Sequence, residues 1–207
     1  MDESAWMNLT ERLADRLCHD VASSAQAIAS GLDLLAEAGS EAEREEAAAF
    51  LTEAVTAQRF KLRYARRAYG PAVQVIDAAE VKALAEALFE GGRAKLQWLV
   101  GEATLGPIAA RCLLLLLQIA ADAVAAGGTA RVEAHADGVV VDAEGPRARV
   151  RDEVRAGLSG EAFDAGLGGR WVQGAFVAAL VGSVGGAVSV DTREGGVCLA
   201  VSLPPPY

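Results

Sequence analysis

Residues 13–35 read LADRLCHDVASSAQAIASGLDLL, and we expect them to form one long amphipathic helix. Mostly apolar residues recur there at intervals of three and four, which places them on one face of a helix. They are Leu13, Leu17, Val21, Ser24, Ile28, Leu32 and Leu35. The opposite face carries the polar residues Arg12, Arg16, His19, Ser23, Gln26 and Ser30. His19 is therefore expected to point toward solvent from the middle of the helix.

Asp20 follows His19 directly, and this pair is the first candidate for chemistry. A neutral imidazole has a free lone pair and titrates near neutral pH, so on an exposed helix face it can act as a nucleophile. A neighbouring carboxylate can orient the ring or accept its proton. The alternative is an ordinary surface histidine beside an ordinary surface acid, and the pair by itself leaves both interpretations open.

A second helix is expected to follow the first, which we place at residues 7–38. It should run over residues 41–69, after a turn at Gly39-Ser40 and with Ser40 as its N-cap. Two long helices joined by a tight turn form an antiparallel hairpin. One hairpin cannot cover two apolar stripes, whereas two hairpins can do so in a four-helix bundle, so the pattern predicts a homodimer.

The composition excludes several classes of partner. The chain has 207 residues and a net charge of −9, which argues against binding to nucleic acids or anionic membranes. No signal peptide is evident, and the most apolar run, Cys112–Leu117, is too short to cross a bilayer. Three cysteines without metal or redox spacing fit a reducing compartment. We therefore expect a cytoplasmic protein.

The pattern changes after residue 70, so we expect two domains, at residues 1–70 and 77–207, joined by a short linker. In the second domain, helices are expected at residues 79–89, 107–125, 150–158 and 170–184. Strands are expected at residues 95–100, 130–135, 139–142, 187–192 and 197–203. Asp137-Gly138 and Glu194-Gly195-Gly196 are typical hairpin turns. This order predicts an α/β sandwich with helices on one face of a mixed sheet.

Several stretches of this chain resemble proteins related to sensor histidine kinases. They are RLCHDVASS at 16–24, SGLDLLAE at 30–37, RFKLRYARRAYG at 59–70 and WVQGAFVAAL at 171–180. The chain is similar to the ChpT-type histidine phosphotransferases of alphaproteobacterial phosphorelays. This resemblance implies a dimeric helical hairpin that carries the phosphorylated histidine. A degenerate kinase-type ATP-binding domain, of the Bergerat type, should follow it.

The second domain departs from a working kinase at the positions that would bind ATP. The expected asparagines and glycines are replaced at Gln118, Asp122, Glu144, Pro146 and the run 171–174, whereas Asp142 matches. Glycines at such positions let backbone N–H groups approach phosphates, and a tryptophan fills that space instead. We therefore expect no ATP, no other cofactor and no metal on this chain. Any magnesium should come from the receiver-domain partner.

By the same resemblance, His19 accepts a phosphoryl group from an aspartyl-phosphate receiver domain and passes it to the receiver of another response regulator. Asp20 is expected to orient the imidazole, and Ser23 to bind a phosphoryl oxygen or position a water. The residues expected to contact the receiver are Arg16, Ala22, Gln26, Arg59, Arg63 and Arg66. The arginines of the second helix should lie beside His19, because the turn at 39–40 places residue 19 level with about residue 60. Alternatively, they only complement the helix dipole.

Two other functions stay open from the sequence. A divergent histidine kinase would still use a nucleotide, and a pseudo-kinase scaffold would bind a regulator without transfer. The exposed position of His19 favours the phosphotransferase and the kinase. The changed glycine motifs favour the phosphotransferase and the scaffold, so the phosphotransferase satisfies both observations.

Overall fold

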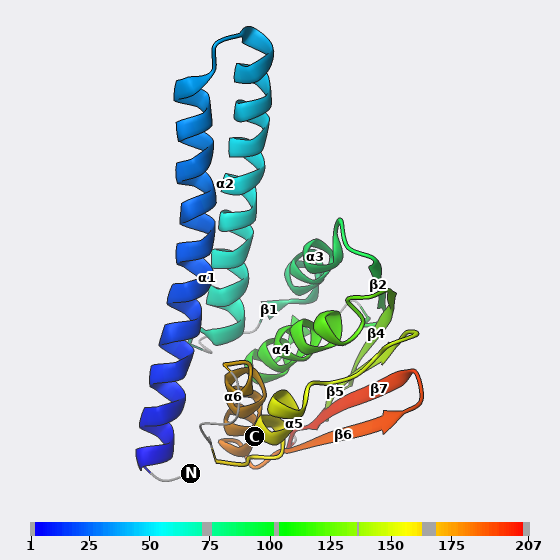
Figure 1. The fold of residues 1–207 in the computed structure, drawn as a ribbon. Coiled ribbons are helices and arrows are strands. Elements are labelled where there is room, and N and C mark those ends of the chain that lie inside the picture. The colour runs from blue at the N-terminus through cyan, green and yellow to red at the C-terminus, as the bar shows by residue number, and fades with distance from the viewer. Residues whose placement is uncertain (1–2, 72–75, 102–103, 136, 163–168, 205–207) are drawn as a thin grey trace.

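The computed structural model describes residues 3–71, 76–101, 104–135, 137–162 and 169–204. Two long antiparallel helices, α1 (Glu3–Glu37) and α2 (Glu41–Tyr69), stand beside an α/β domain, and their tip projects away from it (Figure 1). The bounds of α2 are those predicted. The first helix begins at Glu3 rather than at residue 7, because Leu9 in its first turns is buried against the α/β domain.

The tip of the hairpin is closed by a reciprocal cap. The Ser40 hydroxyl accepts a hydrogen bond from the Glu43 N–H at 3.3 Å. The Glu43 carboxylate accepts bonds from the N–H groups of Gly39 at 2.7 Å and Ser40 at 2.9 Å. These donors stabilise the charged form and hold the pKa of Glu43 below its ordinary value. The capping box confirms the predicted turn at Gly39-Ser40.

The α/β domain has the predicted order of elements. Its helices are α3 (Ala78–Phe89), α4 (Pro107–Ala123), α5 (Asp152–Leu158) and α6 (Trp171–Gly182). Its main strands are β2 (Ala94–Trp98), β4 (Gly128–His135), β5 (Gly138–Glu144), β6 (Ala187–Arg193) and β7 (Gly196–Ser202). Two short strands, β1 (Ile76–Asp77) and β3 (Thr104–Leu105), form a separate antiparallel pair that the pattern did not predict. Two residues are too few to show a period. Of the predicted linker, residues 72–75 lie outside the described part of the chain.

The main sheet has the strand order β2-β4-β5-β7-β6. The β2–β4 pair is parallel and the other pairs are antiparallel, so the sheet is mixed, as predicted. Val132, Val141 and Leu199 are paired across the three central strands and are fully buried. The helices lie along the face that these side chains form (Figure 1).

Helix α4 is the centre of this core. Every residue from Ala110 to Leu117 is buried, and all of them except Arg111 are apolar. It packs on β4, β5 and β7 on one side and on α2, α3 and α6 on the other. A helix enclosed in this way needs no polar face, which explains the apolar run in the sequence.

The base of the hairpin is joined to α4 by buried polar groups. The Tyr64 hydroxyl donates to the Leu114 carbonyl at 2.7 Å, and this tyrosine is 2% exposed. The Arg111 guanidinium donates from Nε to the Ala68 carbonyl at 3.2 Å. The Arg111 bond satisfies a carbonyl near the end of α2, and both bonds attach the hairpin to α4 of the α/β domain.

Helices α5 and α6 meet through two glycines. A Cβ added to Gly157 would overlap the Trp171 carbonyl oxygen and lie 2.6 Å from the Ala175 nitrogen. A Cβ added to Gly174 would overlap the Val154 carbonyl oxygen and lie 2.7 Å from the Leu158 nitrogen. The two backbones are therefore in contact, and any larger residue would separate the helices.

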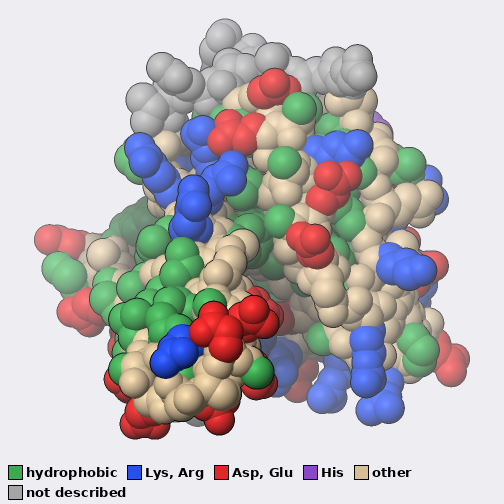
Figure 2. Space-filling view, turned by 90° about the horizontal axis from the view of Figure 1, so that it is seen from above, with side chains coloured by type: hydrophobic (Ala, Val, Ile, Leu, Met, Phe, Trp, Pro, Cys, Tyr) green, Lys and Arg blue, Asp and Glu red, His purple; other side chains and the backbone are tan. Residues whose placement is uncertain are grey.

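The upper hairpin leaves part of its apolar stripe uncovered within one chain. Val21, Leu32, Phe50 and Leu62 are exposed by 39%, 53%, 40% and 48%. Figure 2, which looks down on the hairpin tip, shows hydrophobic side chains spread over one side of this lobe beside acidic ones. A single hairpin therefore does not bury the stripe that the sequence predicted.

Candidate functional site

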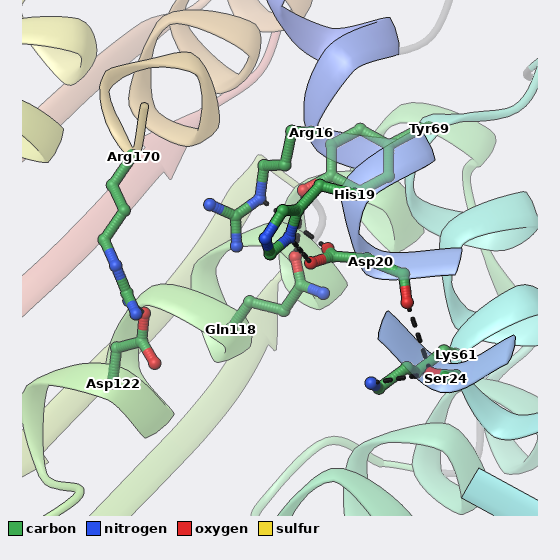
Figure 3. A network of polar contacts seen from close by, with 9 residues as sticks. All are labelled: Arg16, His19, Asp20, Ser24, Lys61, Tyr69, Gln118, Asp122 and Arg170. Atoms are coloured by element: carbon green, nitrogen blue, oxygen red, sulfur yellow. Dashed lines mark hydrogen bonds and ion pairs between the residues drawn. The ribbon is translucent and has the colours of Figure 1, made fainter. Parts of the chain in front are cut away.

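His19 lies in the middle of α1, and its side chain is 80% exposed. This confirms the predicted orientation toward solvent. The imidazole Nδ1 lies 3.6 Å from Asp20 Oδ1, too long for a hydrogen bond but close enough for charge to act (Figure 3). Because the carboxylate is near Nδ1, the other ring nitrogen, Nε2, is the one available to an incoming group.

Asp20 also connects His19 to a second basic group. Its Oδ2 lies 3.9 Å from Arg16 Nε, one turn earlier on α1. The carboxylate is thus placed between the imidazole and a guanidinium that is itself half-buried. Asp20 and Arg16 are both predicted site residues, and they lie together with His19.

The tyrosine at the end of α2 lies beside this pair, and the sequence analysis did not identify it. Burial raises the pKa of Tyr69 to about 12, and the nearby charge of Asp20 raises it while that of Arg16 lowers it. The phenol is therefore protonated at neutral pH. Its hydroxyl donates to Gln118 Oε1 on α4 at 3.0 Å. Figure 3 shows Gln118 reaching from the α/β domain toward Tyr69, Arg16 and Asp20.

The two serines after His19 have different environments. Ser23, the predicted site residue, is exposed, whereas Ser24 is 5% exposed. The Ser24 hydroxyl donates to the Asp20 carbonyl at 3.2 Å and accepts from Lys61 Nζ at 2.8 Å. Ser24 therefore occupies the apolar stripe as a bonded polar group and ties α1 to α2. The helical pattern predicted these opposite faces, but it did not predict the bond from Lys61 to Ser24.

The structure corrects the prediction of which α2 residue lies beside His19. Gly31 packs against Leu51, and Lys61 reaches Ser24, so residue 19 lies level with the turn after Lys61 instead of with residue 60. The prediction counted residues from a turn centred on 39–40, whereas the contact of Gly31 with Leu51 is centred later in the chain. Arg67, which follows the predicted contact residue Arg66, donates two hydrogen bonds to the Glu80 carboxylate, at 2.9 and 3.0 Å.

The remaining residues predicted to contact a receiver are on the hairpin surface. Ala22 and Gln26 are exposed on α1. Arg59, Arg63 and Arg66 are exposed on α2 and form no ion pair within the described part of the chain. The structure thus leaves these side chains accessible, and three guanidinium groups on α2 carry uncompensated positive charge.

Two aspartates of the kinase-like region are paired with arginines of this same chain. Arg170 donates to Asp122, at the position where the resemblance would place a magnesium-binding asparagine (Figure 3). Arg193 donates to Asp142 at 2.8 Å and to Glu144 at 2.6 Å, and these two carboxylates raise the pKa of Arg193. Each of these three carboxylates is therefore paired with a guanidinium of the same chain.

The space between α4, α5 and α6 is almost filled. A cavity of about 10 Å³ remains beside Asp122, Val154 and Gln173, enough for roughly one water molecule. The Gln173 carbonyl oxygen lies there, buried and without a hydrogen-bond partner. Trp171 is 5% exposed, packs with Leu9 of α1 and donates to the Glu161 carbonyl at 3.2 Å. Residues 163–168, between these motifs, lie outside the described part of the chain.

Among the helices that the structure describes, none combines the length and hydropathy needed to span a bilayer. Likewise, the described residues contain no cluster of three or more His, Cys, Asp or Glu side chains arranged to hold a metal ion.

Comparison with known proteins agrees with this architecture. A curated protein phosphotransferase ChpT from Brucella abortus (strain 2308) is 30% identical over 129 residues, and the match spans 61% of this chain and 60% of the relative. A solved bacterial phosphotransferase superposes with a TM-score of 0.81 at 26% identity, covering 94% of this chain and 96% of that one. A histidine kinase domain from Erythrobacter litoralis EL346 is a weaker likeness, with a TM-score of 0.48 and 12% identity over 87% of this chain and 95% of that one.

The family model for the histidine phosphotransferase C-terminal domain matches residues 78–196, which covers α3 to β6 and contains Gln118, Asp122 and Arg170. The hairpin with His19 precedes this match in the same order as the resemblance implied. By the extent of this match, the chain belongs to the histidine phosphotransferase family.

Proposed function

We propose that this protein is a phosphorelay histidine phosphotransferase, which accepts a phosphoryl group on His19 from an aspartyl-phosphate receiver domain and passes it to a second receiver. The observation that carries the proposal is an 80% exposed imidazole with a carboxylate beside its Nδ1, on a chain in which only a small cavity remains beside Asp122 and Gln173. Membership in the family supports the same activity.

The transfer step follows from the placement of the ring. The lone pair of His19 Nε2 attacks the phosphorus, and a nitrogen–phosphorus bond forms while the bond from phosphorus to the aspartyl oxygen of the donor breaks. The electron pair of that bond stays on the donor carboxylate. The phosphorylated ring keeps its Nδ1 proton and is cationic, so the negative charge of Asp20 stabilises it. The second receiver reverses this step with its own aspartate.

We also propose that the protein uses no ATP and holds no metal of its own. The ion pairs Arg170–Asp122 and Arg193–Asp142 and the small cavity beside Gln173 support this. The Arg170 guanidinium is already paired with Asp122. To contact a triphosphate, Arg170 would have to leave this pair, and the Asp122 carboxylate alone would repel the phosphates. The receiver would then supply the magnesium ion that neutralises the phosphoryl group.

The hairpin is the proposed surface for both assembly and docking. Pairing with a second copy would cover Val21, Leu32 and Phe50 and form a four-helix bundle.

The receiver would dock around His19, against Arg16, Ala22 and Gln26, with Ser23 beside the phosphoryl group. The unpaired arginines of α2 would attract an acidic receiver. We place this reaction in the cytoplasm, where response regulators act.

The test is direct transfer from a receiver domain that has been phosphorylated with acetyl phosphate. We expect an acid-labile, base-stable label on this chain, and no label on a His19→Ala variant with an unchanged melting temperature. Label that persists in His19→Ala would refute the site. Label obtained from ATP alone would favour the divergent kinase. Tight binding of the receiver without any label would favour the scaffold.

A further inference from the structure

Three residues from three helices surround the Asp20 carboxylate, and the α/β domain contributes one of them. Arg16 lies 3.9 Å from the carboxylate on α1, and Tyr69 ends α2 close enough to feel both charges. Gln118 on α4 accepts the Tyr69 hydroxyl proton at 3.0 Å. In Figure 3 these side chains lie around His19 and Asp20, with Gln118 reaching toward them from α4. A hydrogen bond thus joins α4 in the α/β domain to Tyr69, and Tyr69 lies within electrostatic range of the Asp20–Arg16 pair beside the exposed imidazole.

The anchors of this set are rigid. Arg111 holds the end of α2 by donating to the carbonyls of Ala68 at 3.2 Å and Tyr69 at 3.5 Å. The Tyr69 ring packs against Phe176 of α6 with centroids 5.3 Å apart. Gln118 belongs to α4, and its neighbours Leu117 and Ile119 are buried in the core. Tyr69 therefore has little freedom to turn, and its hydroxyl has a fixed acceptor.

The far end of the set is exposed by comparison. The Asp20 side chain is 47% exposed and His19 80%, so without neighbours each would sample several rotamers. A nucleophile that must align with a phosphorus atom gains from a restricted orientation, because misplacement by about 1 Å can lower a rate by about a hundredfold. Side chains that hold Asp20 in place from the side of the α/β domain would supply that restriction.

We propose that Tyr69 and Gln118 are positioning residues for His19, which hold Arg16 and Asp20 so that the carboxylate keeps Nδ1 protonated and Nε2 free to accept the phosphoryl group. This proposal rests on the proposed phosphotransfer function. It gives the α/β domain a part in the reaction that requires no nucleotide. The Gln118 side chain, at the position of a kinase asparagine, points toward the hairpin and accepts the bond from Tyr69.

The test uses Tyr69→Phe and Gln118→Leu, with Tyr64→Phe as the matched control. The control also removes one hydroxyl that bonds α2 to α4, but it lies beside Leu114 and not beside Arg16 and Asp20. The first readout is the rate at which phosphoramidate, a small phosphoryl donor, labels His19 in the full-length protein. The second is the ¹⁵N NMR spectrum of the imidazole, which reports the population of each tautomer.

We expect both Tyr69→Phe and Gln118→Leu to lower the labelling rate by about tenfold and to increase the Nε2–H tautomer. Tyr64→Phe should lower the melting temperature but leave rate and tautomer at wild-type values. Wild-type labelling in both positioning variants would overturn the proposal, as would an equal rate loss in Tyr64→Phe. Since phosphoramidate replaces the receiver, a failure of transfer from receivers would refute the proposed function separately, without affecting this measurement.

Discussion

The contact between α5 and α6 leads to a sharp prediction about Gly174. In Gly174→Ala, the new methyl would overlap the Val154 carbonyl oxygen and lie 2.7 Å from the Leu158 nitrogen. Both atoms belong to the backbone, so no side chain can rotate away. The helices must separate, and Val154 and Leu158, which are each 4% exposed, lose contacts with the core.

The expected cost is at the upper end for overpacking, about 3 kcal/mol in the free energy of unfolding. For a domain of this size, each kcal/mol lowers the melting temperature by about 2–4 °C, so Gly174→Ala should melt about 6–12 °C lower. Gly157→Ala should behave alike, because its methyl would meet the Trp171 carbonyl oxygen from the opposite side.

The measurement is thermal and urea unfolding followed by circular dichroism. Gly182→Ala is the matched control: it makes the same change at the end of the same helix, where a new Cβ has nothing within 4 Å. It should leave stability within about 0.5 kcal/mol of wild type. If Gly174→Ala unfolded together with this control, the backbone contact between α5 and α6 would be refuted.

Further predictions concern assembly, docking, nucleotide and pH. Leu32→Glu places a charge on the uncovered stripe and should convert a dimer into a monomer by light scattering; a wild-type monomer at micromolar concentration would contradict the bundle. Replacing Arg63 and Arg66 by Gln should slow receiver association and flatten its salt dependence in stopped-flow transfer, whereas equal salt slopes would leave only dipole complementation. Calorimetry with magnesium ATP should show no saturable heat, even in Arg170→Ala, since the cavity stays closed. The pKa of Tyr69 is about 12 in the folded state and near 10 in the unfolded chain. The contribution of Tyr69 to the free energy of unfolding is therefore complete below pH 10 and is lost as the pH rises toward 12. In urea titrations, Tyr69→Phe should lose less stability than wild type over this pH range. An equal loss in both proteins would contradict the burial of Tyr69.

The sequence predicted the hairpin well because its signals are local. The period of three and four residues set the faces of α1, and the capping box at Ser40 and Glu43 set the start of α2. His19 was predicted to face solvent, and its side chain does. The order of elements in the α/β domain was also predicted, since alternation and glycine turns act over a few residues.

The environment of His19 was only partly predictable. Arg16 and Asp20 lie within one turn of His19, so helical spacing identified them as candidate site residues. Tyr69 and Gln118 are separated by 49 residues, and no short-range pattern relates them. The level of His19 along α2 also depended on how Gly31 packs against α2, which a count from the turn could not give.

The sequence by itself thus determined which segments are helices, which face of α1 carries the nucleophile, and that the glycines expected of a nucleotide site are replaced. Those properties depend on neighbours along the chain. Only the tertiary structure decided that Arg170 neutralises Asp122, 48 residues away, and that Arg193 neutralises Asp142, 51 residues away. It also decided that Tyr69 and Gln118 meet below the site. Such pairs form when separate elements pack on α4, and their partners are selected by three-dimensional proximity, which periodicity does not encode.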